Sequence, residues 1–308
     1  MKTDNFNLIV VLGPTATGKT RFAALLAHAL HGEIISADSR QVYRQMDLGT
    51  GKDYEDYQVE GDTLATHLID ICAPGEKYDV FRFQKDFRTA FVGIQQRQHL
   101  PILCGGTGMY IEAVTRGYRL PEVEENQALR TSLKDKTLTD LQHILAGYKQ
   151  LHNRSDTDTR ERTFRAIEIA AYCQAHPETE KAYPEIVPFF LGMQLDREVC
   201  RQRIAQRLHA RLDAGMVEEV RRLLQQGLKP GDLLYYGLEY KFITRYIIGE
   251  IDYQTMVEKL YIAICQFSKR QMTWFRRMER QGIKIHWIDV KLDNHTKVKQ
   301  ALGLMRTP

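Results

Sequence analysis

Short, almost wholly apolar runs alternate with amphipathic stretches along the first 105 residues of the chain. Runs of four or five residues without helical periodicity are typical of strands that are buried on both faces. Four such strands are expected, at residues 8–12, 33–37, 67–71 and 101–104. Helical spacing follows the first run and recurs from 81 to 97, so the pattern predicts a parallel sheet with helices on both faces. Two later runs, 188–195 and 283–288, could complete that sheet.

The pattern changes at about residue 117. From there to residue 186, strand signals are few, charge is high, and apolar residues follow three-and-four spacing. This predicts a small helical insertion domain at 117–186, within an α/β core formed by residues 1–116 and 187–308. Farther along the core, one continuous helix is expected from 196 to 220.

The chain has 308 residues, of which 43% are hydrophobic and 27% charged, close to ordinary globular usage. This composition excludes a wholly disordered, collagen-like or low-complexity chain, and the length fits about two domains. The net charge of +4, from 43 Lys and Arg against 39 Asp and Glu, is too small to indicate a partner. The five cysteines form no CxxC pair, and neither a leader nor a membrane-length apolar segment is recognisable. We therefore expect a cytoplasmic protein with free thiols and no membrane span.

A glycine-rich segment, GPTATGKT at residues 13–20, lies between the first expected strand and the following helix and fits the pattern GxxxxGK[ST]. Its glycines let backbone N–H groups turn inward around an anion, and the helix N-terminus adds the positive end of its dipole. Lys19 supplies a cation, and the Thr20 hydroxyl can bind Mg²⁺. The segment predicts a P-loop NTPase-like fold, but it does not name a reaction. Phosphate or diphosphate binding is expected at Gly13, Thr15, Ala16, Thr17, Gly18, Lys19 and Thr20.

Polar side chains follow the next strands. Asp38 comes directly after the second strand and should lie on the same sheet edge as the phosphate loop, where it could hold Mg²⁺, act as a base or cap the next segment. Residues 39–44, SRQVYR, offer hydroxyl, amide, guanidinium and aromatic groups suited to an aromatic heterocycle. Thr107, among three glycines after the fourth strand, indicates either close approach of a substrate or a tight turn. Asp70 ends the third strand and could be a metal-binding acid or a solvated strand end.

Two clusters of cations stand out in the C-terminal part. Arg203, Arg207 and Arg211 are spaced four apart, so a helix would place them on one face. Such a column favours an anionic partner, although a solvated helix face would explain it as well. Residues 269–277, KRQMTWFRR, interleave cations with aromatic side chains. That composition suits RNA, and it also suits a helix whose aromatic residues are core.

Taken together, these motifs resemble those of the tRNA dimethylallyltransferases (tRNA isopentenyltransferases). The matching stretches are GPTATGKT (13–20), SADSRQVY (36–43), MDLGTGK (46–52), HLIDI (67–71), PILCGGTGMYIEAV (101–114), RTFRAIEI (162–169), RQRIAQRL (201–208), GMVEEV (215–220) and KRQMTWFRR (269–277). The family transfers a dimethylallyl group from dimethylallyl diphosphate to N6 of the adenosine 3′ of the tRNA anticodon. The resemblance also implies a P-loop core with a helical insertion.

The resemblance implies roles for individual residues. The phosphate loop would hold the prenyl diphosphate with Mg²⁺ as cofactor, and Arg207 would help to stabilise the departing diphosphate. Asp38 matches the general base, and Thr107 matches the threonine that contacts the target base. Contacts to tRNA are implied for Asp38, Ser39, Arg40, Gln41, Thr107, Arg130, Glu161, Arg162, Arg165 and Arg270. The expected partners are a tRNA anticodon stem-loop and dimethylallyl diphosphate, bound by a monomer.

The chain departs from the family pattern in several places. Lys52-Asp53 stands where the family usually has Lys-Pro, and residues 236–239, YGLE, replace its usual Gly-Tyr-Lys/Arg-Glu/Gln. Three other functions stay open at this point. They are prenylation of a free adenine nucleotide, phosphorylation of a small molecule at the phosphate loop, and RNA binding by an inactive paralogue.

Overall fold

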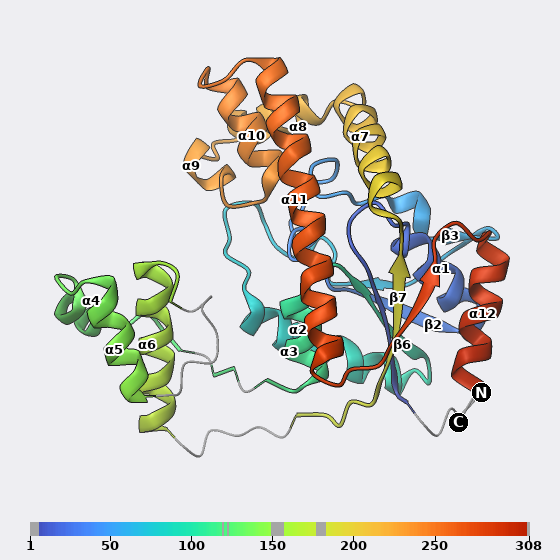
Figure 1. Cartoon of the computed structure of the whole chain (residues 1–308), viewed down its shortest axis with the longest axis horizontal. Coiled ribbons are helices and arrows are strands. Elements are labelled where there is room, and N and C mark those ends of the chain that lie inside the picture. The colour runs from blue at the N-terminus through green and yellow to red at the C-terminus, as the bar shows by residue number, and fades with distance from the viewer. Residues whose placement is uncertain (1–5, 119, 122, 149–156, 177–182, 307–308) are drawn as a thin grey trace. The chain divides into compact units, whose positions relative to one another are not determined.

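Six strands form a parallel sheet in the computed structural model, which describes residues 6–118, 120–121, 123–148, 157–176 and 183–306 (Figure 1). Across the sheet they are Thr66–His67 (β5), Gly32–Ser36 (β2), Leu100–Gly105 (β6), Leu8–Leu12 (β1), Pro188–Gln194 (β7) and Ile285–Asp289 (β8). Each strand is parallel to its neighbours. The parallel α/β fold class expected from the sequence is thus confirmed. Because β1 lies between β6 and β7, the loop that follows it emerges at the middle of the sheet, where such folds bind ligands.

The apolar strands pack on both faces of the sheet. In β1, Leu8, Val10 and Leu12 belong to one core cluster, whereas Ile9 and Val11 belong to a second cluster on the opposite face. All five side chains are fully buried. A strand covered on both sides needs no polar positions, which explains why its sequence is an unbroken apolar run.

Helices supply the other half of each cluster. On the face of Ile9 and Val11 lie Lys19–Leu30 (α1) and Asn294–Arg306 (α12). The opposite cluster draws on Val80–Gln96 (α2), Gly108–Thr115 (α3), Arg197–Asp213 (α7), Met216–Gln225 (α8), Pro230–Leu233 (α9), Leu238–Ile247 (α10) and Tyr253–Arg280 (α11). Short elements connect β2 with β5: the 3-10 helix Tyr54–Tyr57 (η1) and the hairpin of Gln58–Val59 (β3) and Asp62–Thr63 (β4).

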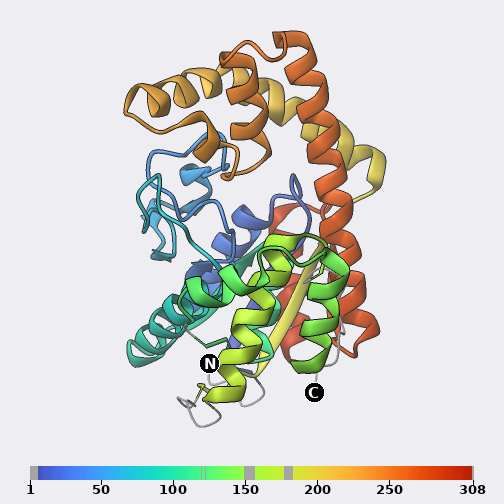
Figure 2. The same cartoon turned by 90° about the vertical axis from the view of Figure 1, so that its left-hand side faces the viewer.

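Helix α11 connects the group of helices α7 to α10 with the helix α3 beside the sheet. In both views, α7 to α10 gather beyond the carboxyl end of β7, and α11 runs from them along the sheet (Figures 1 and 2). It packs against α10, α7 and α3. No helix within the described ranges is both long and apolar enough to cross a bilayer.

Two sequence expectations need correction. The third strand, expected at 67–71, is only Thr66–His67, because Leu68 and Asp70 adopt left-handed backbone conformations with φ of 62° and 56°. The expected helix from 196 to 220 is two helices. Gly215, with φ of 99°, separates α7 from α8, as glycine often does where a helix ends.

The chain folds as two compact units, Met1–Tyr118 with Pro184–Pro308, and Arg119–Tyr183. The second unit contains helices Gln127–Leu133 (α4), Leu138–Tyr148 (α5) and Arg160–Ala175 (α6). They enclose a separate apolar cluster around Leu141, Leu145 and Ile167. Asn126 and Thr159 cap the N-termini of α4 and α6 through side-chain hydrogen bonds.

Candidate active site

A pocket of about 380 Å³, a size typical of small-ligand sites, opens at the carboxyl edge of the sheet. Its wall combines the phosphate loop, the segments after β2 and β6, and helices α7, α10 and α11. The site residues expected from the sequence that line it are Thr15, Lys19, Thr20, Asp38, Ser39, Arg40, Gln41, Thr107 and Arg207. Residues separated by up to about 190 positions in the chain therefore meet in one cavity.

The phosphate loop turns sharply between β1 and α1. Ala16 and Gly18 have φ of 64° and 71°, and among the described residues no side chain caps the first N–H groups of α1. These groups are therefore available to an anion, as at other helix N-termini. The Thr17 hydroxyl closes the loop by donating to Pro14 O at 2.9 Å. Burial lowers the pKa of Lys19, so the protonated lysine gains from an anionic ligand.

Helix α11 holds the phosphate loop from outside. Gln271 accepts a hydrogen bond from the backbone N–H of Thr15 at 2.9 Å and donates to the carbonyl of Gly106 at 3.0 Å. One amide thus ties the loop after β1 to the loop after β6. Arg207 of α7 donates to the Thr15 hydroxyl. Gln271 is not among the site residues predicted from the sequence, although it lies within the KRQ motif.

Asp38 and Thr107 lie at the ends of neighbouring strands. Thr107 donates its backbone N–H to Ala37 O at 3.3 Å, and its hydroxyl accepts from the Ser39 N–H at 3.3 Å. Oδ1 of Asp38 accepts from the Arg40 N–H at 2.9 Å. Oδ2 accepts no hydrogen bond from the described residues, so this oxygen can take a proton from a ligand. Asp38 can therefore cap the following segment through Oδ1 and act as a base through Oδ2, the two roles that the sequence left open.

Two arginines of α7 face the pocket. Arg207 and Arg211 line it and Arg203 does not, so the expected column divides into two pocket residues and one outside. Arg211 pairs with Asp53 at 3.0 Å. Burial and, secondarily, the Arg211 guanidinium lower the pKa of Arg207 to about 10. Arg207 is therefore still a cation at neutral pH, and an anionic ligand would relieve the repulsion between the two guanidinium groups.

Part of the wall is apolar, which sequence analysis did not identify. Leu238, Ile264 and Phe267 line the pocket together with Cys104. Burial raises the pKa of Cys104 to about 12, so this thiol is neutral at physiological pH. Near the same cavity the Arg40 guanidinium stacks 5.0 Å from the ring centre of Tyr235. The only sequence signal for the α10 side of this wall was the altered YGLE segment.

The remaining predicted RNA contacts lie elsewhere. Arg270 lines a second hollow, of about 580 Å³, with Gln266, Lys269, Thr273, Trp274, Arg277 and Arg280. In the second unit, Arg130 and Arg165 both pair with Glu168, at 2.7 and 3.3 Å. Arg162 pairs with Asp158 at 3.4 Å, and Glu161 is exposed. Their contacts with RNA stay predictions.

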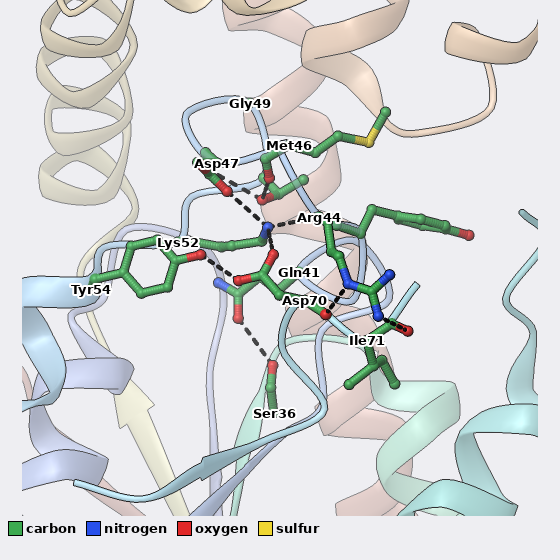
Figure 3. A network of polar contacts seen from close by, with 12 residues as sticks. Ser36, Gln41, Arg44, Met46, Asp47, Gly49, Lys52, Tyr54, Asp70 and Ile71 are labelled. Carbon is green, nitrogen blue, oxygen red and sulfur yellow. Dashed lines mark hydrogen bonds and ion pairs between the residues drawn. The ribbon is translucent and has the colours of Figure 1, made fainter. Parts of the chain in front are cut away.

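Asp70 does not line the pocket, which argues against the first of its two possible roles, that of a metal-binding acid. Its carboxylate accepts hydrogen bonds from the Lys52 ammonium and, at 2.5 Å, from the Tyr54 hydroxyl (Figure 3). The left-handed backbone conformation of Asp70 turns the chain away from the sheet, so the strand does not extend to residue 71 as expected.

Comparisons with known proteins agree with this geometry. The model of the IPP transferase family matches residues 41–278, and that of the isopentenyl transferase family matches residues 6–63. The chain is 55% identical over 301 residues to tRNA dimethylallyltransferase 1 of Parabacteroides distasonis, with 98% of each protein covered.

Solved structures extend the comparison to the fold. A tRNA isopentenylpyrophosphate transferase from Bacillus halodurans has a TM-score of 0.70 at 28% identity, over 97% of this chain and 95% of that one. A eukaryotic dimethylallyltransferase acting on tRNA shares the fold, with a TM-score of 0.75 at 20% identity, over 96% of this chain and 77% of that one. With a family match over more than half of its length, this chain belongs to the IPP transferase family.

Proposed function

We propose that this protein transfers a dimethylallyl group from dimethylallyl diphosphate to N6 of the adenosine 3′ of the anticodon in tRNA. One observation carries the proposal. The phosphate loop, the Asp38–Thr107 pair and an apolar wall open into the same pocket. A phosphate loop alone would suit many reactions, but a cavity that adds a partly apolar wall and a free carboxylate oxygen suits a prenyl diphosphate and an amine.

The diphosphate end of the substrate would lie on the phosphate loop. The open N–H groups at the start of α1, the Lys19 ammonium and the Arg207 guanidinium are donors to its oxygens. These charges oppose the negative charge that grows on the diphosphate as the C1–O bond breaks, and stabilising developing charge is an efficient form of catalysis. The dimethylallyl tail would contact Leu238, Ile264 and Phe267.

The residues present fit Mg²⁺ bound together with the substrate. The Thr20 hydroxyl and the Asp38 carboxylate are hard oxygen donors that line the pocket. Within the described ranges no cluster of three or more His, Cys, Asp or Glu could hold a metal ion. Mg²⁺ commonly binds through one or two protein oxygens plus phosphate oxygens and water. When bound, it would neutralise part of the diphosphate charge.

Asp38 would act on the amine. As N6 of adenine bonds to C1 of the dimethylallyl group, the amine must lose a proton, and Oδ2 of Asp38 is free to accept it. The hydrogen bond from the Arg40 N–H to Oδ1 orients the carboxylate. Thr107, held by the backbone at Ala37 and Ser39, would contact the base. A positioned base contributes about 10²- to 10⁴-fold in rate.

The target adenosine must leave its stack to enter this pocket, as for other enzymes that modify bases. The Arg40–Tyr235 stack beside the cavity offers cation and aromatic surface to RNA. We further propose that Arg270 and its neighbouring cations contact the RNA backbone, and that Arg130, Glu161, Arg162 and Arg165 contribute from the second unit. The protein would act as a monomer in the cytoplasm, where its tRNA substrate is found.

The proposal is tested by incubating the protein and Mg²⁺ with labelled dimethylallyl diphosphate and either bulk unmodified tRNA or AMP. We expect label in tRNA, recovered by mass spectrometry as N6-dimethylallyl-adenosine. The Asp38→Asn variant should lose at least about 10²-fold in kcat, whereas Asp62→Asn, at an exposed carboxylate of β4, should not. Label that enters only AMP, or phosphate transfer from ATP without prenyl transfer, would overturn the proposal.

A further inference from the structure

Lys52 lies in the sequence between residues of the pocket wall, and its side chain is 0% exposed. Its Nζ donates to Asp47 Oδ1 at 2.9 Å, to the Tyr43 carbonyl at 2.5 Å and to the Asp70 carboxylate (Figure 3). An ammonium has three donors, and here each finds an acceptor. Removing Lys52 would leave the Asp47 and Asp70 carboxylates, which are 46% and 33% exposed, without their buried cation.

This network fastens one wall of the pocket. Residues 49–51 and Asp53 line the cavity on either side of Lys52 in the sequence. The Gln41 amide donates to Gly51 O at 2.9 Å, and its Oε1 accepts from the Ser36 hydroxyl at 3.0 Å. The wall held by Lys52 is therefore in direct contact with the segment that carries Asp38.

Two neighbouring residues hold the wall from opposite sides. Lys52 points into the network with Asp70, while Asp53 pairs with Arg211 of α7. Glu219 of α8 holds the start of the same segment, because its carboxylate accepts the backbone N–H groups of residues 47–49 at 2.8–3.1 Å. The wall is thus bound to β2, α7 and α8, and Lys52 anchors it to Asp70 on the inner side.

The phosphate loop has its own support. Thr15 is held by Gln271 and Arg207, and neither of these hydrogen bonds involves Lys52. A change at Lys52 should therefore disturb the side of the pocket that receives the amine more than the phosphate loop, because the wall reaches the pocket arginines indirectly, through the Asp53–Arg211 pair.

We propose that Lys52 is a positioning residue for prenyl transfer: it holds residues 49–53 and, through Gln41, the Asp38 segment in the geometry needed for attack by the amine. This inference rests on the proposed function. Lys52 does not line the pocket, so its effect is indirect. Misplacement of a reacting group by about 1 Å can cost about 10²-fold in rate, so loss of the tie should reduce kcat far more than diphosphate affinity.

The test compares Lys52→Met with Lys297→Met. Lys297, on α12, is also buried, but it does not line the pocket. For each full-length variant we would measure kcat with saturating dimethylallyl diphosphate and tRNA, and the Kd for inorganic pyrophosphate by calorimetry with Mg²⁺. We expect kcat of Lys52→Met to fall at least about tenfold with the pyrophosphate Kd within about threefold of wild type. Lys297→Met should keep both values.

Two outcomes would overturn the proposal: folded Lys52→Met with a wild-type kcat, or a pyrophosphate Kd that weakens as much as kcat falls. If Lys52→Met does not fold, Asp70→Asn and Tyr54→Phe loosen the same network more gently, and a wild-type kcat in Asp70→Asn is then the refuting result. Failure of the proposed function gives a different pattern, because wild type would then transfer no prenyl group. In that case, weaker binding of an anticodon stem-loop RNA by Lys52→Met, with unchanged pyrophosphate Kd, would support positioning, and unchanged RNA binding would refute it.

Discussion

Replacing Gln271 by leucine should weaken diphosphate binding without touching any residue of the phosphate loop. The amide of Gln271 is buried and makes two hydrogen bonds, from the Thr15 N–H and to the Gly106 carbonyl. Leucine fills a similar volume but has no polar atom, so both backbone groups lose their partner. The loop would no longer be tied to the strand end beside it.

The magnitude follows from those two bonds. Leaving a buried donor or acceptor unsatisfied costs about 1–3 kcal/mol, so the two lost contacts should lower the free energy of unfolding by about 2–6 kcal/mol. Part of this lost free energy destabilises the loop conformation that binds the anion. If about 1.4 kcal/mol of it must be restored when the anion binds, the Kd for pyrophosphate rises about tenfold.

Gln84 provides a matched control. It is equally buried, and its amide donates to two backbone carbonyls, Ala113 O at 2.8 Å and Tyr118 O at 2.7 Å, away from the pocket. Gln84→Leu should destabilise the fold by a similar amount, measured by urea unfolding, but leave the pyrophosphate Kd unchanged. Equal effects of both variants on Kd, or none from Gln271→Leu, would refute the assignment of Gln271 as the support of the loop.

Two further predictions concern stability. Arg97 above all, with His67 and His99, lowers the pKa of Glu33 to about 2 from 4.5, so the ionised carboxylate stabilises the fold above about pH 4.5 and this contribution disappears as the pH falls toward 2. The stability difference between wild type and Glu33→Gln, measured by urea unfolding, should therefore shrink over that range; a constant difference would contradict it. Glu219→Gln puts an NH₂ group against backbone donors and should cost about 2–4 kcal/mol, more than Tyr240→Phe, which removes a single hydroxyl donor; equal losses in thermal unfolding would contradict this order.

The sheet and the phosphate loop were predictable because their signals are local. The run at residues 8–12 and the loop at 13–20 each carry their pattern within a few residues, and the side chains after β2 and β6 meet because parallel strands end at one edge. The strand predicted at residues 67–71 was wrong beyond His67, because an apolar run predicts burial but not the left-handed conformations of Leu68 and Asp70.

The supports of the site could not be predicted in the same way. Gln271 meets Thr15 across 256 positions, and Lys52 meets Asp70 across 18, so neither contact has a periodic or local signature. The burial of Lys52 also could not be predicted from its residue type, because lysine is rarely buried without partners. These contacts depend on the tertiary structure, which brings their distant partners together.

Helix α11 fixes the distance between the apolar wall of the pocket and the phosphate loop. Ile264 and Phe267 form part of the hydrocarbon wall, and Gln271, on the same helix, clamps the phosphate loop. Seven residues of α-helix span about 10.5 Å, so the separation between the tail region and the anion cradle is built into a rigid rod. A substrate with a longer tail cannot be admitted by sliding the helix, because that would pull the clamp from the loop. Evolution or design toward longer prenyl chains must therefore shorten side chains such as Phe267 and leave the rod where it is.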